Sequence, residues 1–219
     1  INANTKKWVA CLVLGLAGLS VSALAATPPQ AAAAKPAFAK VAAAKLAPAA
    51  ALALQKILPA QSSIRFTSTQ MGVPVQGRFT QLSGTVHFDA KNLAATRIAL
   101  DVPVASVTLD SDDADAELPK AEWFDAARFP QANFVLTSAQ AVGAGEYEVQ
   151  GSLRIKGQSL PIKSRVRMVQ SQGLTWASGS FRISRLAYKI GAGPWGDTSI
   201  VADPVDVQYK IALAGLAPF

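Results

Sequence analysis

The sequence predicts an all-β domain in which one antiparallel sheet curls into a barrel. From Ser62 onward, apolar and polar residues alternate with the period of two that is typical of half-buried strands. Short turns containing glycine separate these stretches, as at residues 142–145 and 156–158. A long sheet with one polar face and no helices to cover the other buries its apolar face by curling, and closure removes its exposed edges.

The net charge divides the chain into two parts. The formal charge is +7 over 219 residues. Residues 1–60 hold six lysines and no acidic residue, so residues 61–219 hold 15 basic and 14 acidic side chains. The predicted barrel is therefore nearly neutral, which argues against a nucleic-acid partner. The single cysteine, Cys11, and the single histidine, His87, exclude an internal disulfide and a multi-histidine metal site.

Residues 1–25 have the order of an export signal. Lys6 and Lys7 precede an apolar run over residues 8–19, and small residues then lead to Ala25. We expect cleavage after Ala25 and secretion of the mature chain. An uncleaved membrane anchor is the alternative, because residues 8–26 come close to the roughly 20 apolar residues that a membrane-spanning helix needs.

Residues 26–60 form a predicted linker. They contain many alanines, five prolines and four lysines, and no large apolar set that would form a core. We expect this segment to be disordered or partly helical. The alternative is a basic helix that lies on a membrane surface, since leucine, isoleucine and lysine side chains recur in it.

The domain begins at residue 61, and its alternating stretches are the predicted strands. They cover residues 64–67, 82–88, 98–104, 132–136, 146–156, 160–168 and 205–213. Seven or eight such strands with short turns indicate an antiparallel sheet. An eight-stranded barrel either fills with side chains or encloses one small apolar ligand. A two-sheet sandwich is the structural alternative.

The acid-rich segment at residues 111–127 interrupts the alternation. Its acids favour a helix start, and Pro119 limits the helix to one or two short turns. We expect these turns to lie over one end of the barrel, with Trp123, Phe124 and Phe129 as an apolar plug. The segment has neither the glycine nor the glutamate at the positions where a calcium-binding loop has them, so the sequence predicts no metal site.

Catalytic motifs are absent from the sequence. It contains no Gly-x-Ser-x-Gly elbow and no phosphate-binding glycine loop, and residues 191–196 are expected to form a loop at the barrel rim. His87 falls on the polar face of a predicted strand, so we expect an exposed histidine, no cofactor and no enzyme activity. A basic stripe is predicted on the outer face, where it is either solvated or contacts anionic lipid headgroups: Arg154, Lys156, Lys163, Arg165 and Arg167.

Five segments in order resemble the YceI-like family of polyisoprenoid-binding periplasmic proteins. They are Met71–Phe79, Asp115–Leu118 followed by Glu122–Asp125, Arg128–Phe134, Val149–Gly157 and Ile183–Gly191. The resemblance implies an extended eight-stranded antiparallel lipocalin-like β-barrel around an isoprenoid chain, in the periplasm, with the acid-rich segment as its helical element.

One motif departs from the family pattern. Where the family often has Arg-Asp-x-His-Leu, this chain keeps Asp115 and Leu118 but has Ala114 and Glu117. Together with residues 123–125 and 194–197, this variant is similar to the branch found beside or fused to membrane diheme b-type cytochromes. That resemblance implies a quinone-like ligand or a quinone-linked membrane partner.

The apolar side chains that alternate along the predicted strands form an inward stripe, which faces the interior of the barrel. This inward stripe would supply the ligand-binding wall, or a solid core if the barrel is collapsed. Its predicted members are Phe66, Phe79, Val86, Phe88, Leu100, Val102, Phe134, Leu136, Leu153, Ile155, Ile162, Val166, Trp176, Val205, Val207 and Tyr209. The predicted barrel-end and entrance residues are Asp115, Leu118, Trp123, Phe124 and Trp195.

The expected function is non-enzymatic binding or transport of a long-chain isoprenoid lipid, of polyprenyl or isoprenoid-quinone type. The alternative is an interaction module that docks on a quinone-linked membrane redox complex through the basic stripe or the Trp195 loop. An enzyme that acts on a lipid headgroup through His87 is a third hypothesis. The oligomeric state stays open, a dimer included.

Overall fold

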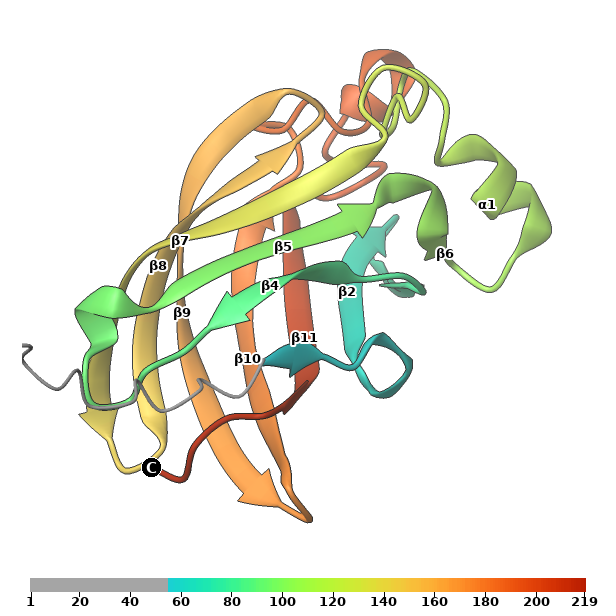
Figure 1. The fold of residues 1–219 in the computed structure, drawn as a ribbon. Helices are drawn as coiled ribbons and strands as arrows, with labels where there is room; N and C mark the ends of the chain where they lie inside the picture. Colours follow the sequence, from blue (N-terminus) through green and yellow to red (C-terminus); the bar gives the residue numbers. More distant parts are fainter. Residues whose placement is uncertain (1–54) are drawn as a thin grey trace, which may run out of the picture. The chain divides into compact units, whose positions relative to one another are not determined.

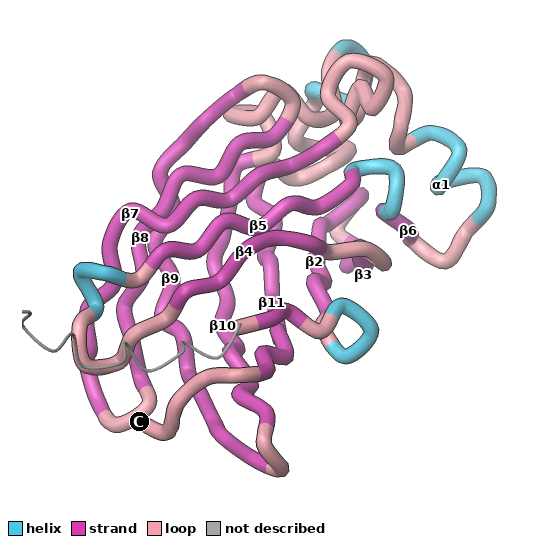
Figure 2. Tube along the Cα trace, viewed as in Figure 1, coloured by secondary structure: helices cyan, strands magenta, loops and turns pink. Residues whose placement is uncertain are grey.

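The computed structural model describes residues 55–219, which form one strongly curled antiparallel sheet (Figures 1 and 2). The strands are β1 (Lys56–Ile57), β2 (Ser63–Gln70), β3 (Val73–Phe79), β4 (Ser83–His87), β5 (Arg97–Pro103), β6 (Val107–Thr108), β7 (Gln131–Gly143), β8 (Glu146–Ile155), β9 (Gln158–Ser171), β10 (Leu174–Ser184) and β11 (Pro204–Ala214). The helix α1 (Asp112–Glu117) and four 3-10 turns are the only helical elements of the described residues: η1 (Pro59–Gln61), η2 (Leu93–Ala95), η3 (Val104–Ser106) and η4 (Gly193–Gly196). The predicted signal and most of the predicted linker lie outside the described residues.

The strand order is β4-β5-β7-β8-β9-β10-β11-β2-β3-β6, with β1 paired to β11 beside this path. This confirms the all-β class and the curled antiparallel sheet. The predicted number of eight strands was wrong, because the sheet has eleven strands. Within residues 55–219 no ladder joins the terminal strands β4 and β6, so backbone pairing leaves the sheet open at that edge.

The strands that the alternation did not predict have identifiable reasons for their weak signal. β3 carries Pro74 and Gly77, both of which are unfavourable in strands. β10 has small residues at Ala177 and Gly179, where a strand of this sheet would ordinarily place large apolar side chains. β1 and β6 have two residues each, too few for a period. Lys56 and Ile57, predicted to lie in the linker, pair with the last residues of β11.

The two ends of the curled sheet differ in their covering (Figure 1). At one end lie α1, the turns of residues 118–130 and the long loop of residues 185–203, in yellow-green and orange. At the other end lie the β7–β8 and β9–β10 hairpin turns. Buried apolar residues fill the interior near both ends, with Val104 and Phe124 in one cluster and Tyr147 and Met168 in another. In residues 55–219 no helix has the length and apolar character needed to cross a membrane.

Gly151 on β8 allows the ring of Phe134 on β7 to lie directly over the backbone. A Cβ atom at residue 151 would lie 2.2 Å from the Phe134 ring and 2.6 Å from the Val135 carbonyl oxygen. We expect Gly151→Ala to lower the free energy of unfolding by about 1–3 kcal/mol, because this contact overpacks the wall. Gly143→Ala is the control, since its Cβ would meet nothing closer than 3.6 Å. Urea unfolding of both variants tests this, and equal destabilisation would contradict the packing account.

Candidate functional site

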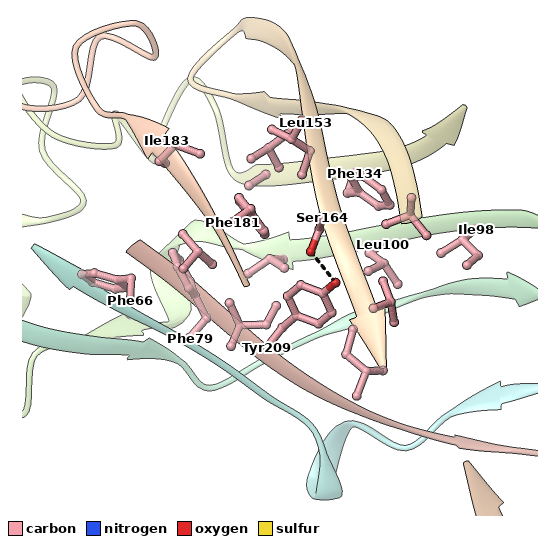
Figure 3. A pocket seen from close by; sticks show the side chains of 18 of the residues that line it. Phe66, Phe79, Ile98, Leu100, Phe134, Leu153, Ser164, Phe181, Ile183 and Tyr209 are labelled. Carbon is pink, nitrogen blue, oxygen red and sulfur yellow. Dashed lines mark hydrogen bonds between the residues drawn. The ribbon is translucent and has the colours of Figure 1, made fainter. Parts of the chain in front are cut away.

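A cavity of about 270 Å³ lies inside the curled sheet (Figure 3). It is lined by every residue of the predicted inward stripe except Trp176. The wall is made almost entirely of apolar side chains, and its polar exceptions include Ser164, Tyr209 and Arg185. The stripe therefore surrounds a hollow interior rather than a solid core. Whether these residues bind a ligand stays a prediction.

Trp176 was placed on the wrong face of β10. Ala177 lines the cavity, so its neighbour Trp176 points to the outer surface. There the Nζ atom of Lys210 lies 4.4 Å from the centre of the Trp176 ring. The prediction of an inward Trp176 was therefore wrong, because the parity of the strand decides its direction.

Several lining residues were missed by the sequence analysis. Phe181 and Ile183 share the face of Ala177 on β10. Ile64 and Ile98 lie on predicted strands but were left out of the predicted wall. The alternation of inward and outward side chains within each strand could have predicted their positions. For β10 that signal becomes usable only once its register with β11 is known, with Ala177 opposite Ile211.

Arg185 lies at the end of the cavity near the 185–203 loop and is only 2% exposed. Its Nε donates a hydrogen bond to the carbonyl of Ala202, and its Nη1 donates to those of Ile190 and Gly191. Its Nη2 donates to the Val201 carbonyl at 2.5 Å. Burial lowers the pKa of Arg185, although the nearby Asp203 carboxylate opposes this shift. The guanidinium thus holds the 185–203 loop together from inside.

Lys156 does not belong to the exposed basic stripe in which it was predicted. It occupies the β8–β9 turn with φ of 46° and is 8% exposed. Its Nζ donates to the carbonyl oxygens of Ala121 and Lys189, both at 2.7 Å, and to that of Glu122 at 3.3 Å. The turn conformation redirects the side chain inward, so that it ties the 118–130 segment to the 185–203 loop. Burial lowers the pKa of Lys156.

The other members of the predicted basic stripe are exposed on the outer face: Arg154, Lys163, Arg165 and Arg167. Acidic residues of β8 lie opposite two of these positions, because Glu146 pairs with Arg167 and Glu148 with Arg165. The Lys163 Nζ lies 2.9 Å from the Glu148 carboxylate. Neighbouring carboxylates therefore offset part of the positive charge of this face.

A family model described as the YceI-like domain matches residues 55–213. The chain belongs to the YceI-like family. The crystal structure of BcnA from Burkholderia cenocepacia is 33% identical and covers 72% of this chain and 99% of BcnA, with a TM-score of 0.69. A UPF0312 protein of Vibrio cholerae is 28% identical over 154 residues, which cover 68% of this chain and 82% of that protein. A polyisoprenoid binding domain from Saccharophagus degradans is 17% identical, covers 76% of this chain and 99% of that domain, and has a TM-score of 0.61. The last likeness shows the fold alone.

In this YceI-like domain, the five predicted barrel-end residues occupy different environments. Leu118 and Phe124 are buried and line the cavity. Trp123 and Trp195 pack against each other, with ring centres 5.4 Å apart, and are not part of the cavity wall. The Asp115 carboxylate accepts hydrogen bonds from the Leu109 N–H and the Thr108 hydroxyl, which fixes α1 beside β6. A role for these residues as an entrance stays a prediction.

His87, the residue proposed for catalysis in the third hypothesis, lies on β4 opposite Arg97. In the part of the chain that the structure describes, its side chain makes no hydrogen bond and no ion pair that would orient it as a base. No group of three or more histidine, cysteine or acidic residues in residues 55–219 is arranged to hold a metal ion.

Tyr188 makes the stability of the YceI-like domain sensitive to alkaline pH. It is 1% exposed, and burial raises its pKa from 10.0 to about 12. Between these values the unfolded chain loses the proton while the native chain keeps it. The stability that Tyr188 contributes is therefore complete below pH 10 and falls by about 2–3 kcal/mol as pH rises through 12.

The control for this prediction is Tyr188→Phe, which should reduce the loss of stability between pH 10.5 and 12. Part of the loss should remain, because burial also raises the pKa of Tyr147 and Tyr209. The Tyr188 hydroxyl makes only a 3.4 Å contact with the Leu153 carbonyl, so its removal should lower the free energy of unfolding little at neutral pH. Lys156 has the opposite effect, because its pKa is lowered in the folded chain from the ordinary value of 10.5. Its contribution to stability therefore rises with pH below 10.5. Urea unfolding across this range measures the slope, and identical slopes in both proteins would contradict the assignment.

Proposed function

We propose that this YceI-like protein binds a long-chain isoprenoid lipid inside its cavity and carries it without chemical change. The observation that carries the proposal is the nearly uninterrupted apolar wall, formed by inward side chains of strands β2 to β5 and β7 to β11. Such a wall offers few polar groups to a sugar, nucleotide or peptide. The polyisoprenoid binding domain of Saccharophagus degradans, which shares this fold, supports a prenyl ligand.

The energetics of apolar burial fit a prenyl chain. Each buried methylene contributes about 0.8 kcal/mol, so one five-carbon unit contributes roughly 3–4 kcal/mol before the costs of ordering the chain. A few units therefore suffice for tight binding without any charged contact. Both polyprenyl lipids and isoprenoid quinones satisfy this requirement.

A chain-length series tests the proposal. We expect the affinity to rise from geraniol to farnesol to geranylgeraniol, each step about tenfold or more, because every added unit buries further methylenes and methyl groups. Displacement of a fluorescent fatty probe from the purified protein measures these affinities. Linear alcohols of equal carbon number are the control for a general dependence of affinity on ligand hydrophobicity. Affinities that do not change with length would contradict binding inside the cavity.

We propose the periplasm as the compartment in which the protein acts. The support is the export-type order of residues 1–25, together with the resemblance that first suggested this location. These residues lie outside the part that the structure describes.

Docking on a quinone-linked membrane complex is the weaker candidate. Two of the groups expected to form the docking face have internal contacts instead, since Lys156 is buried and Trp195 packs on Trp123. The exposed residues that remain of that face are Arg154, Lys163, Arg165 and Arg167. We therefore place lipid carriage first.

A further inference from the structure

Two hydroxyl groups face each other within the mostly apolar cavity. Ser164 on β9 and Tyr209 on β11 both line the cavity, and their oxygens lie 2.9 Å apart (Figure 3). The strand between them, β10, has Gly179 at the crossing point. A Cβ atom there would lie 2.4 Å from the Tyr209 hydroxyl oxygen. The absence of a side chain at Gly179 is what allows Tyr209 to reach across β10 to Ser164.

The hydrogen-bond inventory fixes the direction of this contact. Each hydroxyl has one proton to donate. The Ser164 hydroxyl lies 2.9 Å from the Ser180 carbonyl and 3.4 Å from the Arg165 carbonyl, and a carbonyl only accepts. Both short contacts are hydrogen bonds only if Ser164 donates to the carbonyl and Tyr209 donates to Ser164.

This assignment makes the Tyr209 oxygen an acceptor toward the cavity. Among the described residues no other donor contacts it, so its lone pairs stay available while its proton is engaged. The other strongly polar group of the wall, Arg185, already donates to four backbone carbonyls. At this position the cavity wall therefore offers an incoming lipid a hydrogen-bond acceptor, among apolar side chains such as Phe181, whose ring centre lies 6.2 Å from that of Tyr209.

We propose that the ligand is an isoprenoid lipid with a hydroxyl group that donates a hydrogen bond to Tyr209 inside the cavity. This inference rests on the proposed function. A hydroxyl buried without a partner loses its bonds to water, and Tyr209 replaces one of them. An ether or a quinone carbonyl brings only an acceptor, which Tyr209 cannot satisfy while it donates to Ser164. The Tyr209 position thus favours prenyl alcohols, phenols and quinols over the matching ethers and quinones.

The test compares geranylgeraniol with geranylgeranyl methyl ether by displacement of a fluorescent probe, in the wild-type protein and three variants. We expect the ratio of alcohol to ether affinity to fall about tenfold in Tyr209→Phe, the size of one hydrogen bond in a dry site. Ser164→Ala releases the Tyr209 proton toward the cavity, so the ether should gain affinity and the ratio should again fall. Tyr188→Phe changes a buried tyrosine that is not part of the cavity wall, and it should leave the ratio unchanged.

The outcomes separate this inference from the proposed function. If both lipids bind but the ratio is the same in wild type, Tyr209→Phe and Ser164→Ala, the hydroxyl assignment is overturned and lipid binding stands. A fall of the ratio in Tyr188→Phe alone would also overturn it. If neither lipid binds any of the four proteins, the proposed function fails, and this inference fails with it.

Discussion

Ala177→Trp is expected to weaken binding of geranylgeraniol at least 100-fold while the domain still folds. Ala177 is the small residue of the β10 wall, opposite Met168 on one neighbouring strand and Ile211 on the other. An indole at this position extends into the cavity of about 270 Å³ and takes the volume that the lipid chain needs. The lost burial of even one five-carbon unit accounts for the expected effect.

The matched control places the same side chain on the other face of the same strand. Ser178 is the next residue of β10, and its partner on β9 is the exposed Arg167. Ser178→Trp should therefore leave the affinity within about twofold of wild type. Circular dichroism verifies the fold of both variants, and Ile162→Phe is a smaller filling substitution if Ala177→Trp does not fold. Wild-type affinity in a folded, filled variant would contradict binding in the cavity.

Arg185→Met is expected to cause the largest loss of stability, about 3–5 kcal/mol. The substitution keeps an unbranched chain of similar length but leaves the buried carbonyls of Ile190, Gly191, Val201 and Ala202 without the donors that Arg185 supplies. For a domain of this size the melting temperature should fall by roughly 10 °C. Arg185→Lys keeps the charge but not the planar fork, so it should recover only part of the loss.

Arg182 supplies the control for this prediction, three residues earlier on β10. Its Nε lies 2.6 Å from the carboxylate of Asp206, but both side chains are exposed, at 68% and 52%. Arg182→Met should cost less than about 1 kcal/mol, because exposed ion pairs contribute little. Thermal and urea unfolding of the two variants measure the difference. Equal losses would show that the carbonyl cluster around Arg185 does not stabilise the loop.

The period of two was sufficient to predict the class of fold, and 15 of the 16 residues of the predicted inward stripe line the cavity, although they are fewer than half of its 35 lining residues. On a strand with large apolar residues, such as β8, alternation alone shows which side chains point inward. On β10 the inward positions include the small residues Ala177 and Gly179, which give no apolar alternation. The prediction of an inward Trp176 on this strand was wrong. Small inward residues are themselves informative once the register is known, because Gly179 makes room for Tyr209.

The polar contacts that hold the covered end could not be predicted in the same way. Lys156 and Arg185 both donate to backbone carbonyls, and a carbonyl acceptor leaves no pattern in the sequence. For Lys156 the strand period placed the side chain outward, but its positive φ in the β8–β9 turn ends the alternation one residue early. The Ser164–Tyr209 pair was hidden for a related reason, since its residues are 45 positions apart and meet only across β10.

Native mass spectrometry of the protein purified from the cells that naturally produce it tests the central claim most directly. The account predicts a species heavier than the protein alone by the mass of one prenyl lipid, which organic extraction releases and Ala177→Trp lacks. Protein that is consistently without lipid in repeated preparations, or that carries the same lipid in wild type and in Ala177→Trp, would contradict it.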